Sequence, residues 1–444
     1  MKRDVYVLCG CWACTLTAST LITASAPLAA RHIGASRALA PFTIGAFLFG
    51  AAVISVVSSR LFVAVGRGWG FAVGCFLGMA GGLCGVVALE TRAPFLVFVA
   101  CVLIGTSQGL GQFYRFAATE ICDADGDKAS AVGLVLAGGI VAAIAGPEAA
   151  ASARRLEPLG LHADFSGCFA LVAFANVLNL CLIGSVRFAK VRAYEVFEGS
   201  DDPEGGVEAP RAGGLATDAR GKTRLRAIFS QPECVCAVWV ATLAHTAMVM
   251  LMSPLTLAME QDKFSFRKTS TTLELHFLFM YAPGLFGTGR LIAAFGPYVA
   301  SGCGLVIFAA SASVLAAGQS LAEYASGMVL CGVAWNLCFT SGTVLLTQCY
   351  DARDAVRVQG CNDLIIFGVA ALGSLGSGYV FSWMGWRRLV FVVSGLGSGP
   401  RVARGRARRT WRGRATCPGP RGPRTCERPR RGSGPWTTAR RGGS

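Results

Sequence analysis

Long apolar segments recur along this chain and constrain its fold more than any other feature. A membrane-spanning helix needs roughly 20 apolar residues in a row. Segments of that length lie at 5–30, 40–65, 69–89, 94–119, 129–150, 165–186, 234–259, 270–295, 298–317, 324–350 and 355–384. Only 15% of the residues are charged and the mean hydropathy is +0.52, values that exclude a soluble globular enzyme and a disordered polymer. The sequence therefore predicts an all-α, multi-pass membrane protein.

The net charge of +16 is concentrated at one end of the chain. Residues 399–444 hold fourteen Arg and one acid, Glu427, so the remaining 398 residues are nearly neutral. This balance does not support nucleic-acid binding. Basic residues in the loops, most of them in a polar linker, favour a cytoplasmic N-terminus.

The two halves of the chain repeat each other. A shift of 227 residues aligns Gly105 with Gly332 and Gly146 with Gly373, and it also aligns tryptophans and prolines of the first and seventh segments. A shift of 230 aligns RLFVAVG, which ends at Gly66, with RLIAAFG, which ends at Gly296. Because six helices separate the copies, the second copy has the same sense as the first.

This repeat predicts a domain layout. We expect a six-helix bundle at 1–187, a cytoplasmic linker at 188–231, and a second bundle at 232–397 with five clear helices and a stub of the sixth. Residues 398–444 are rich in Arg, Pro and Gly and are expected to be disordered. Two origins of this tail stay open, a frame-shift or gene-model artefact and a real basic tail.

Parallel repeats of six helices are the architecture of the major facilitator superfamily, and local motifs resemble it too. Tyr114 with Arg115 resembles its intramembrane Arg motif. The loop after the second segment resembles its Gly-x-x-x-Asp-Arg-x-Gly-Arg-Arg motif but lacks the acid. That loop motif and its copy comprise Arg60, Gly66, Arg67, Arg290 and Gly296. A glycine-proline motif in the fifth segment comprises Gly138, Gly139, Gly146 and Pro147.

Longer strings resemble a largely uncharacterised group of bacterial-type permeases of this superfamily. They are QFYRFAATE, LAGGIVAAIAGP, MSPLTLAM, FLFMYAPGLFGTGRLIAAFG and WNLCFTSGTVLLTQ followed by VQGCNDLIIFG. The resemblance covers about 5–386 and implies a major facilitator fold, two six-helix bundles in parallel repeat, with helix 12 lost or truncated.

Ionisable residues inside a membrane are costly and therefore point to function. Arg115, Asp363, His276, Glu274 and His245 are the candidates for coupling or gating. Each has a structural alternative: Arg115 could snorkel to the surface, and the others could serve as hydrogen-bonding or headgroup-level residues. The resemblance implies that Arg115 and Asp363 meet when the cytoplasmic side closes.

Few neutral polar residues are expected on the wall of a central cavity. The candidates are Gln108, Gln112, Tyr114, Trp335 and Asn336. Such a wall suits a small, weakly polar or amphipathic organic solute. No nucleotide-binding loop or catalytic triad is present, so we expect no enzyme, no cofactor and no metal.

The sequence thus predicts a secondary transporter that works by alternating access, with proton coupling as an open question. A non-transporting receptor or scaffold of the same fold and an inactive truncated transporter are the alternatives. The expected partners are a small-molecule substrate, the lipid bilayer and protons, and the expected state is a monomer. The sequence does not distinguish a plasma membrane from an organelle membrane.

Overall fold

A computed structural model describes residues 3–121, 125–154, 160–188, 225–350 and 354–396 of the 444. Within these ranges every long element is a helix. Nearly all of the predicted linker and the whole predicted tail lie outside the described residues, so the expected domain boundaries stay predictions.

The first half of the chain supplies six elements, which we call the first half of the bundle. They are α1 (Arg3–His32), α2 (Phe42–Glu90), α3 (Pro94–Gly111), α4 (Tyr114–Ile121), α5 (Asp125–Ser152) and α6 (Ser166–Gly184). Here α2 contains two predicted spans, because the chain bends at Gly66 without an intervening loop. One predicted span is divided into α3 and α4 by a turn at Gln112 and Phe113.

The second half is built on the same plan. Its elements are α8 (Leu225–Phe229), α9 (Pro232–Gln261), α10 (Phe266–Pro283), η2 (Gly284–Thr288), α11 (Gly289–Phe295), α12 (Pro297–Ala317), α13 (Leu321–Thr347) and α14 (Ala355–Leu396). The predicted span at 270–295 is continuous but includes the π-helical turn η2. Such turns often occur at functional sites in helices.

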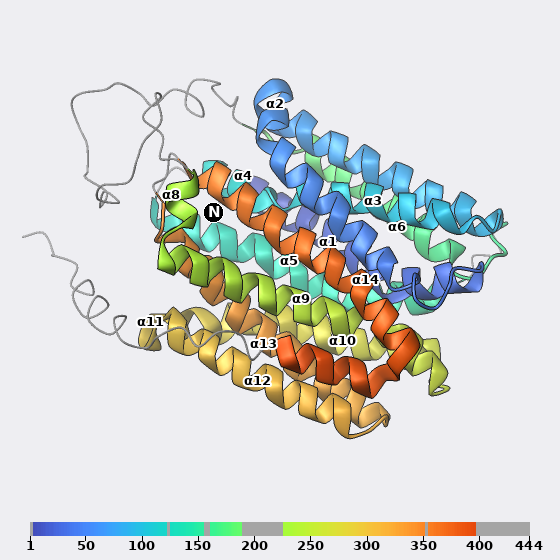
Figure 1. Cartoon of the computed structure of the whole chain (residues 1–444). Helices are drawn as coiled ribbons and strands as arrows, with labels where there is room; N and C mark the ends of the chain where they lie inside the picture. Colours follow the sequence, from blue (N-terminus) through green and yellow to red (C-terminus); the bar gives the residue numbers. More distant parts are fainter. Residues whose placement is uncertain (1–2, 122–124, 155–159, 189–224, 351–353, 397–444) are drawn as a thin grey trace, which may run out of the picture. The chain divides into compact units, whose positions relative to one another are not determined.

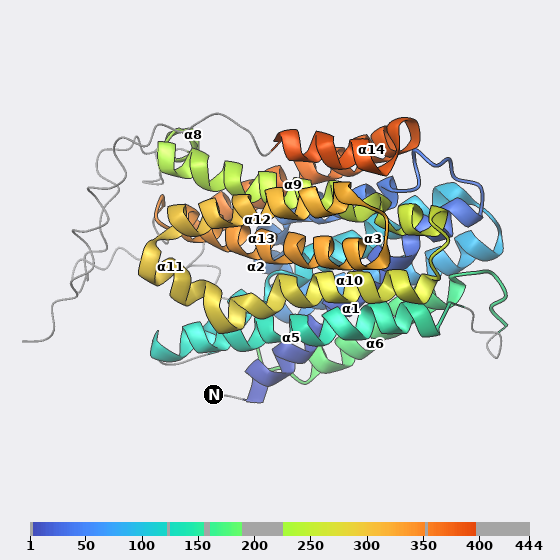
Figure 2. The ribbon, with the colours of Figure 1, turned by 90° about the horizontal axis from the view of Figure 1, so that it is seen from below.

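The halves contact each other through equivalent helices. In the first half α2 packs against α3 and α6, and α1 against α5; in the second half α9 packs against α13 and α14. Between the halves, α14 lies along α2 and α10 lies along α5 (Figures 1 and 2). Because α10 is the repeat of the start of α2, and α14 the repeat of α5, these two contacts are copies of each other. This is the arrangement that a pseudo-two-fold axis between parallel repeats produces.

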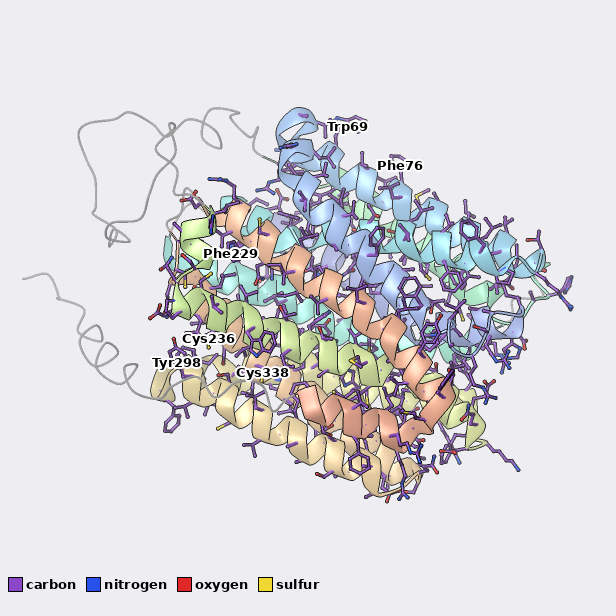
Figure 3. The ribbon with its side chains drawn as sticks, viewed as in Figure 1. Trp69, Phe76, Phe229, Cys236, Tyr298 and Cys338 are labelled. Atoms are coloured by element: carbon purple, nitrogen blue, oxygen red, sulfur yellow. The ribbon has the colours of Figure 1, made fainter. Side chains whose placement is uncertain are left out.

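Apolar side chains also cover the outside of the bundle. Trp69 is 70% exposed and Phe76 is 51% exposed, and Figure 3 shows both projecting from α2 at the edge of the bundle. Among the described residues, nine helical segments have the length and composition to cross a membrane, and Phe42–Ser58 is a shorter apolar helix. An outer surface of this kind is suited to lipid rather than water.

The last helix is short. The chain turns at Gly385 (φ 77°, ψ 178°), and the helix then continues only to Leu396. At 1.5 Å per residue this piece is about 16 Å long, whereas the bilayer core is about 30 Å thick. The described part of helix 12 is therefore shorter than a full span; residues 397–444 lie outside the described residues, so the predicted truncation stays a prediction.

Candidate functional site

A cavity of about 380 Å³ lies between the two halves. Its wall takes residues from α1, α2, α3, α4 and α5 in the first half and from α9, α10, α13 and α14 in the second. The wall includes Trp12, Ser19, Gln108, Gln112, Arg115, His245, Tyr281, Trp335, Asn336, Phe339, Asp363 and Phe367. The volume falls in the range of small-molecule sites.

An aromatic cluster forms the second half's side of the cavity. The rings of Trp335 and Phe339 are stacked, with centroids 4.5 Å apart and planes at 14°. The edge of His245 approaches Phe367, with ring centroids 5.4 Å apart. The indole Nε1–H of Trp335 donates to Nδ1 of His245 at 3.1 Å. These contacts hold His245 in one orientation beside the cavity.

Two amide side chains on the cavity wall have different hydrogen-bonding capacity. The hydroxyl of Ser19 donates to Oε1 of Gln108 at 2.7 Å, which leaves the Gln108 NH₂ group directed away from that bond. Asn336 is used inside the second half, because Thr288 of η2 donates to its Oδ1 and its Nδ2 donates to the carbonyl of Met280 at 2.8 Å. Gln108 is therefore available to a solute, whereas Asn336 holds η2 against α13.

Two opposite charges face the same cavity. Arg115 lies in the first turn of α4, in the first half. Asp363 lies about two turns into α14, in the second half. Both side chains are partly buried, and the amide of Asn362 donates to Oδ1 of Asp363 at 3.2 Å. The structure therefore places a cation and an anion of different halves around one space, toward the end of the bundle where α1 begins. We call this the N-terminal end.

Three predicted residues lie away from the cavity. Tyr114 is 2% exposed, its ring lies 4.5 Å from that of Phe71, and the amide of Asn179 donates to its hydroxyl at 3.1 Å, so it belongs to the core of the first half. His276 is fully buried, with Nδ1 2.8 Å from the carbonyl oxygen of Met328. Glu274 lies on the same helix, near the opposite, far end of the bundle. None of the three is among the residues that line this cavity.

The glycine-proline motif packs helices. A Cβ at Gly138 would lie 2.5 Å from the carbonyl of Cys9 in α1, and one at Gly146 would clash with Thr20. Gly139 lies against Tyr281 of the second half, where a Cβ would be 3.2 Å from the ring. Pro147 follows within α5. The motif thus allows α5 to approach α1 and α10.

The loop motif and its copy mark two equivalent bends. Gly66 has φ 82° and ψ 165°, and Gly296 has φ 86° and ψ 158°. Beside the first bend, the Arg67 guanidinium lies 5.1 Å above the ring of Phe62. Arg60 and Arg290 are exposed at matching positions before the two bends. The predicted loop between the second and third spans is in fact this single bend.

Contacts at the far end join the halves, and the sequence did not predict them. Arg267 of α10 pairs with Glu148 of α5 at 3.4 Å. His32 at the end of α1 lies 3.7 Å from Glu260 of α9 and 3.9 Å from Asp164. The partners are separated by 119 to 228 residues, so only the folded topology brings them together.

Aromatic rings extend the same contact. Phe165, before α6, meets Phe266 of α10 edge to face at 5.2 Å. The guanidinium of Arg154 lies 4.6 Å above Phe165 and 5.9 Å above Phe266, and it pairs with Asp164 at 2.9 Å. We call Arg154, Asp164, Phe165, Phe266, Arg267, Glu148, His32 and Glu260 the far-end cluster.

The chain is similar to curated membrane transporters over most of its length. It is 27% identical over 393 residues to the riboflavin transporter RfnT of Brucella anthropi, covering 88% of this chain and 92% of that protein. It is 24% identical over 380 residues to the uncharacterized MFS-type transporter YdeG of Bacillus subtilis, covering 84% of each. No family model matches the chain.

Solved transporter structures have the same fold. The nucleoside transporter NupG superposes with a TM-score of 0.62 at 13% identity, over 89% of this chain and 96% of that one. A bacterial homologue of the human lysosomal transporter Spinster, in an inward-facing and unoccupied conformation, gives a TM-score of 0.63 at 15% identity, over 85% and 82%.

Proposed function

We propose that this chain, which is similar over most of its length to curated transporters and has the fold of solved transporters of the major facilitator superfamily, is a secondary active transporter of a small organic solute. The observation that carries the proposal is the cavity of about 380 Å³ whose wall is shared by both halves. Rocking of two similar halves about such a cavity would expose it to each side in turn.

The far-end cluster supports a specific state in this cycle. Charged and aromatic side chains join the halves at the far end, whereas the cavity wall extends toward the N-terminal end as far as Arg115 and Asp363. With a cytoplasmic N-terminus, this is the inward-facing state. Transport then requires the far-end cluster to separate and the N-terminal end to close.

Riboflavin is our candidate solute. One relative, which the chain matches over 88% of its own length, is a riboflavin transporter. The cavity offers features suited to a flat aromatic ring, namely the stacked pair Trp335 and Phe339 and a wall otherwise dominated by apolar side chains. A few neutral polar groups then orient the solute.

Proton coupling is assigned to the charges at the N-terminal end. Closing this end would bring Arg115 toward Asp363, and an ion pair made in only one state biases the equilibrium between states. Protonation of Asp363 would weaken that pair and release the closed end. Tyr350, whose hydroxyl accepts from Gln359 at 2.7 Å, is the neighbouring titratable group.

The test is uptake of radiolabelled riboflavin by proteoliposomes that contain the full chain. We expect uptake to saturate, to exceed that of empty liposomes, and to rise when an inward proton gradient is imposed. A matched control is Trp69→Ala, since Trp69 lies on the outer surface away from the cavity. Riboflavin binding without uptake would instead support the receptor alternative. Absence of both, in protein shown to be folded by its thermal melting, would support the inactive truncated transporter.

A further inference from the structure

The hydrogen bond between Trp335 and His245 determines where the imidazole carries its proton. An indole nitrogen is only a donor, so the nitrogen that it meets must act as an acceptor. Nδ1 of His245 is that acceptor, at 3.1 Å. A doubly protonated imidazole has no acceptor nitrogen, and the neutral ring carries one proton. His245 is therefore neutral, with its proton on Nε2.

That Nε2–H group is a donor without a protein acceptor. His245 is only 8% exposed, and its Nε2 atom has no hydrogen-bond partner in the described part of the chain. A buried donor left unsatisfied is costly, so such groups in native proteins usually meet a ligand or water. The residue lines the cavity, but Nε2 itself has almost no accessible surface in this state. The acceptor that fits is therefore a solute that enters the cavity and displaces the side chains covering Nε2.

A second donor reaches the cavity from the other half. The Ser19 hydroxyl has one hydrogen and lies 3.0 Å from the Thr15 carbonyl oxygen and 2.7 Å from the Gln108 amide. Whichever of the two it donates to, the Gln108 NH₂ group keeps at least one N–H beyond this contact, and Gln108 lines the cavity. By contrast, both ends of the Asn336 amide are bonded within the protein. The cavity wall thus holds a hydrogen-bond donor on each half, one from α3 and one from α9.

We propose that His245 is a specificity-determining residue whose Nε2–H donates to a carbonyl oxygen or unprotonated ring nitrogen on the edge of a planar heteroaromatic solute. Trp335 is a positioning residue that fixes the tautomer, and Gln108 supplies the second donor. The inference rests on the proposed transport function and narrows its substrate class. Flavin-like and other oxo-substituted ring systems have such edges; saturated sugars and hydrocarbons do not.

The tautomer is tested without any solute. The chain has four histidines, so ¹⁵N-histidine spectra of the full chain in lipid nanodiscs are simple, and His245→Asn identifies the relevant signals. We expect a neutral ring protonated at Nε2 at pH 7, and a mixture of tautomers in Trp335→Phe. A ring protonated at Nδ1, or doubly protonated, in the unmodified chain overturns the inference even if transport is observed.

The recognition role is tested by binding of riboflavin, followed by its fluorescence. Removing the donor in His245→Leu should weaken the affinity about tenfold, whereas His245→Asn, which retains an N–H donor, should stay within about threefold. His276→Leu is the matched control, because it removes a buried histidine that does not line the cavity. Lumiflavin, which has the ring without the ribityl chain, should compete, and ribitol should not.

Each outcome separates the two proposals. Equal riboflavin affinities of the unmodified chain and His245→Leu overturn the role of His245 and leave transport intact. Competition by ribitol alone overturns the assigned solute class. If His245→Leu does not fold, the comparison of Trp335→Phe with the unmodified chain replaces it, and equal affinities and equal tautomers in that pair would again contradict the inference. Absence of uptake alongside normal binding contradicts the transport proposal alone.

Discussion

Gly66 and Gly296 lie 230 residues apart and adopt the same backbone conformation, with φ and ψ of 82° and 165° in one and 86° and 158° in the other. Residues with a Cβ rarely adopt this region. Each glycine lies between two consecutive helices of its half, at the end of the bundle that we call the N-terminal end. The sequence match between the two heptapeptides therefore reflects an identical requirement for a tight reversal between two membrane helices.

The first prediction concerns these two bends. Gly66→Ala and Gly296→Ala should each destabilise the chain by roughly 1–3 kcal/mol, because alanine is strained at this φ and ψ. At Gly66 lack of space is not the cause, since no heavy atom lies within 4 Å of a Cβ built there. Thermal unfolding in detergent, read by loss of monodisperse protein, measures the effect.

Gly368→Ala in α14 is the control, because its site is equally open and its backbone is helical. An equal loss in all three variants would contradict the strain argument.

The repeat also explains why so much of the fold is predictable from sequence. The aligned glycines Gly105 and Gly332 occupy equivalent contacts, against the backbone carbonyls of Phe47 and His276 respectively. The 230-residue shift places Phe47 opposite position 277, one residue from His276. Close helix contacts require small residues at fixed positions, so the pattern survives in the sequence where the side chains around it have diverged.

The cavity was only partly predictable. Gln108, Gln112 and Arg115 are spaced by four and three residues, share one face and line the cavity together. Tyr114 lies between Gln112 and Arg115 in sequence but on another face of the helix. Its offset from the helical spacing of the three cavity residues could have assigned it to the core. The bond between His245 and Trp335 joins residues 90 positions apart and depends on the crossing of α9 and α13, for which no local pattern exists.

The second prediction concerns the close contacts themselves. Gly332→Ala would place a Cβ 2.6 Å from the carbonyl oxygen of His276, and Gly105→Ala would place one even closer to that of Phe47. Backbone cannot move aside as a flexible side chain does, so each variant should separate two helices and cost about 1–3 kcal/mol. The thermal midpoint measures this, with Gly302→Ala as an open helical control. Unchanged midpoints in both variants would show that these contacts do not limit stability.

The third prediction is coupling between Arg115 and Asp363. Arg115→Ala and Asp363→Asn should each lower riboflavin uptake, because each removes one of two opposite charges, and a charge in the membrane costs about 2.5–3.5 kcal/mol that an opposite charge partly offsets. The double variant should resemble either single variant rather than show the sum of both losses.

Proton dependence gives the same pair a second test. Asp363→Asn removes the group that would take up the proton, so uptake should lose its dependence on an imposed proton gradient. Leu136→Ala, a change on the cavity wall that alters no charge, should leave that dependence in place. Additive losses in the double variant would indicate that the two charges act separately.

The last prediction concerns the far-end cluster, which must open in each transport cycle. Arg267→Gln or Glu148→Gln removes an ion pair between α10 and α5. Because the two side chains are 68% and 40% exposed, the pair contributes at most about 1 kcal/mol. That value corresponds to a shift of up to about fivefold toward the state that is open at the far end. Hydrogen exchange of the backbone amides at the start of α10 should accelerate accordingly.

Lys268→Gln is the matched control: it removes a cation from the same turn, but Lys268 lies 5.9 Å from the ring of Phe264 in its own half. The difference between the variants and the unmodified chain should shrink at 1 M salt, where charges are screened within about 3 Å. Persistence of the difference at high salt would assign the closure to the rings of Phe165 and Phe266 instead, since contact between apolar rings does not weaken with ionic strength.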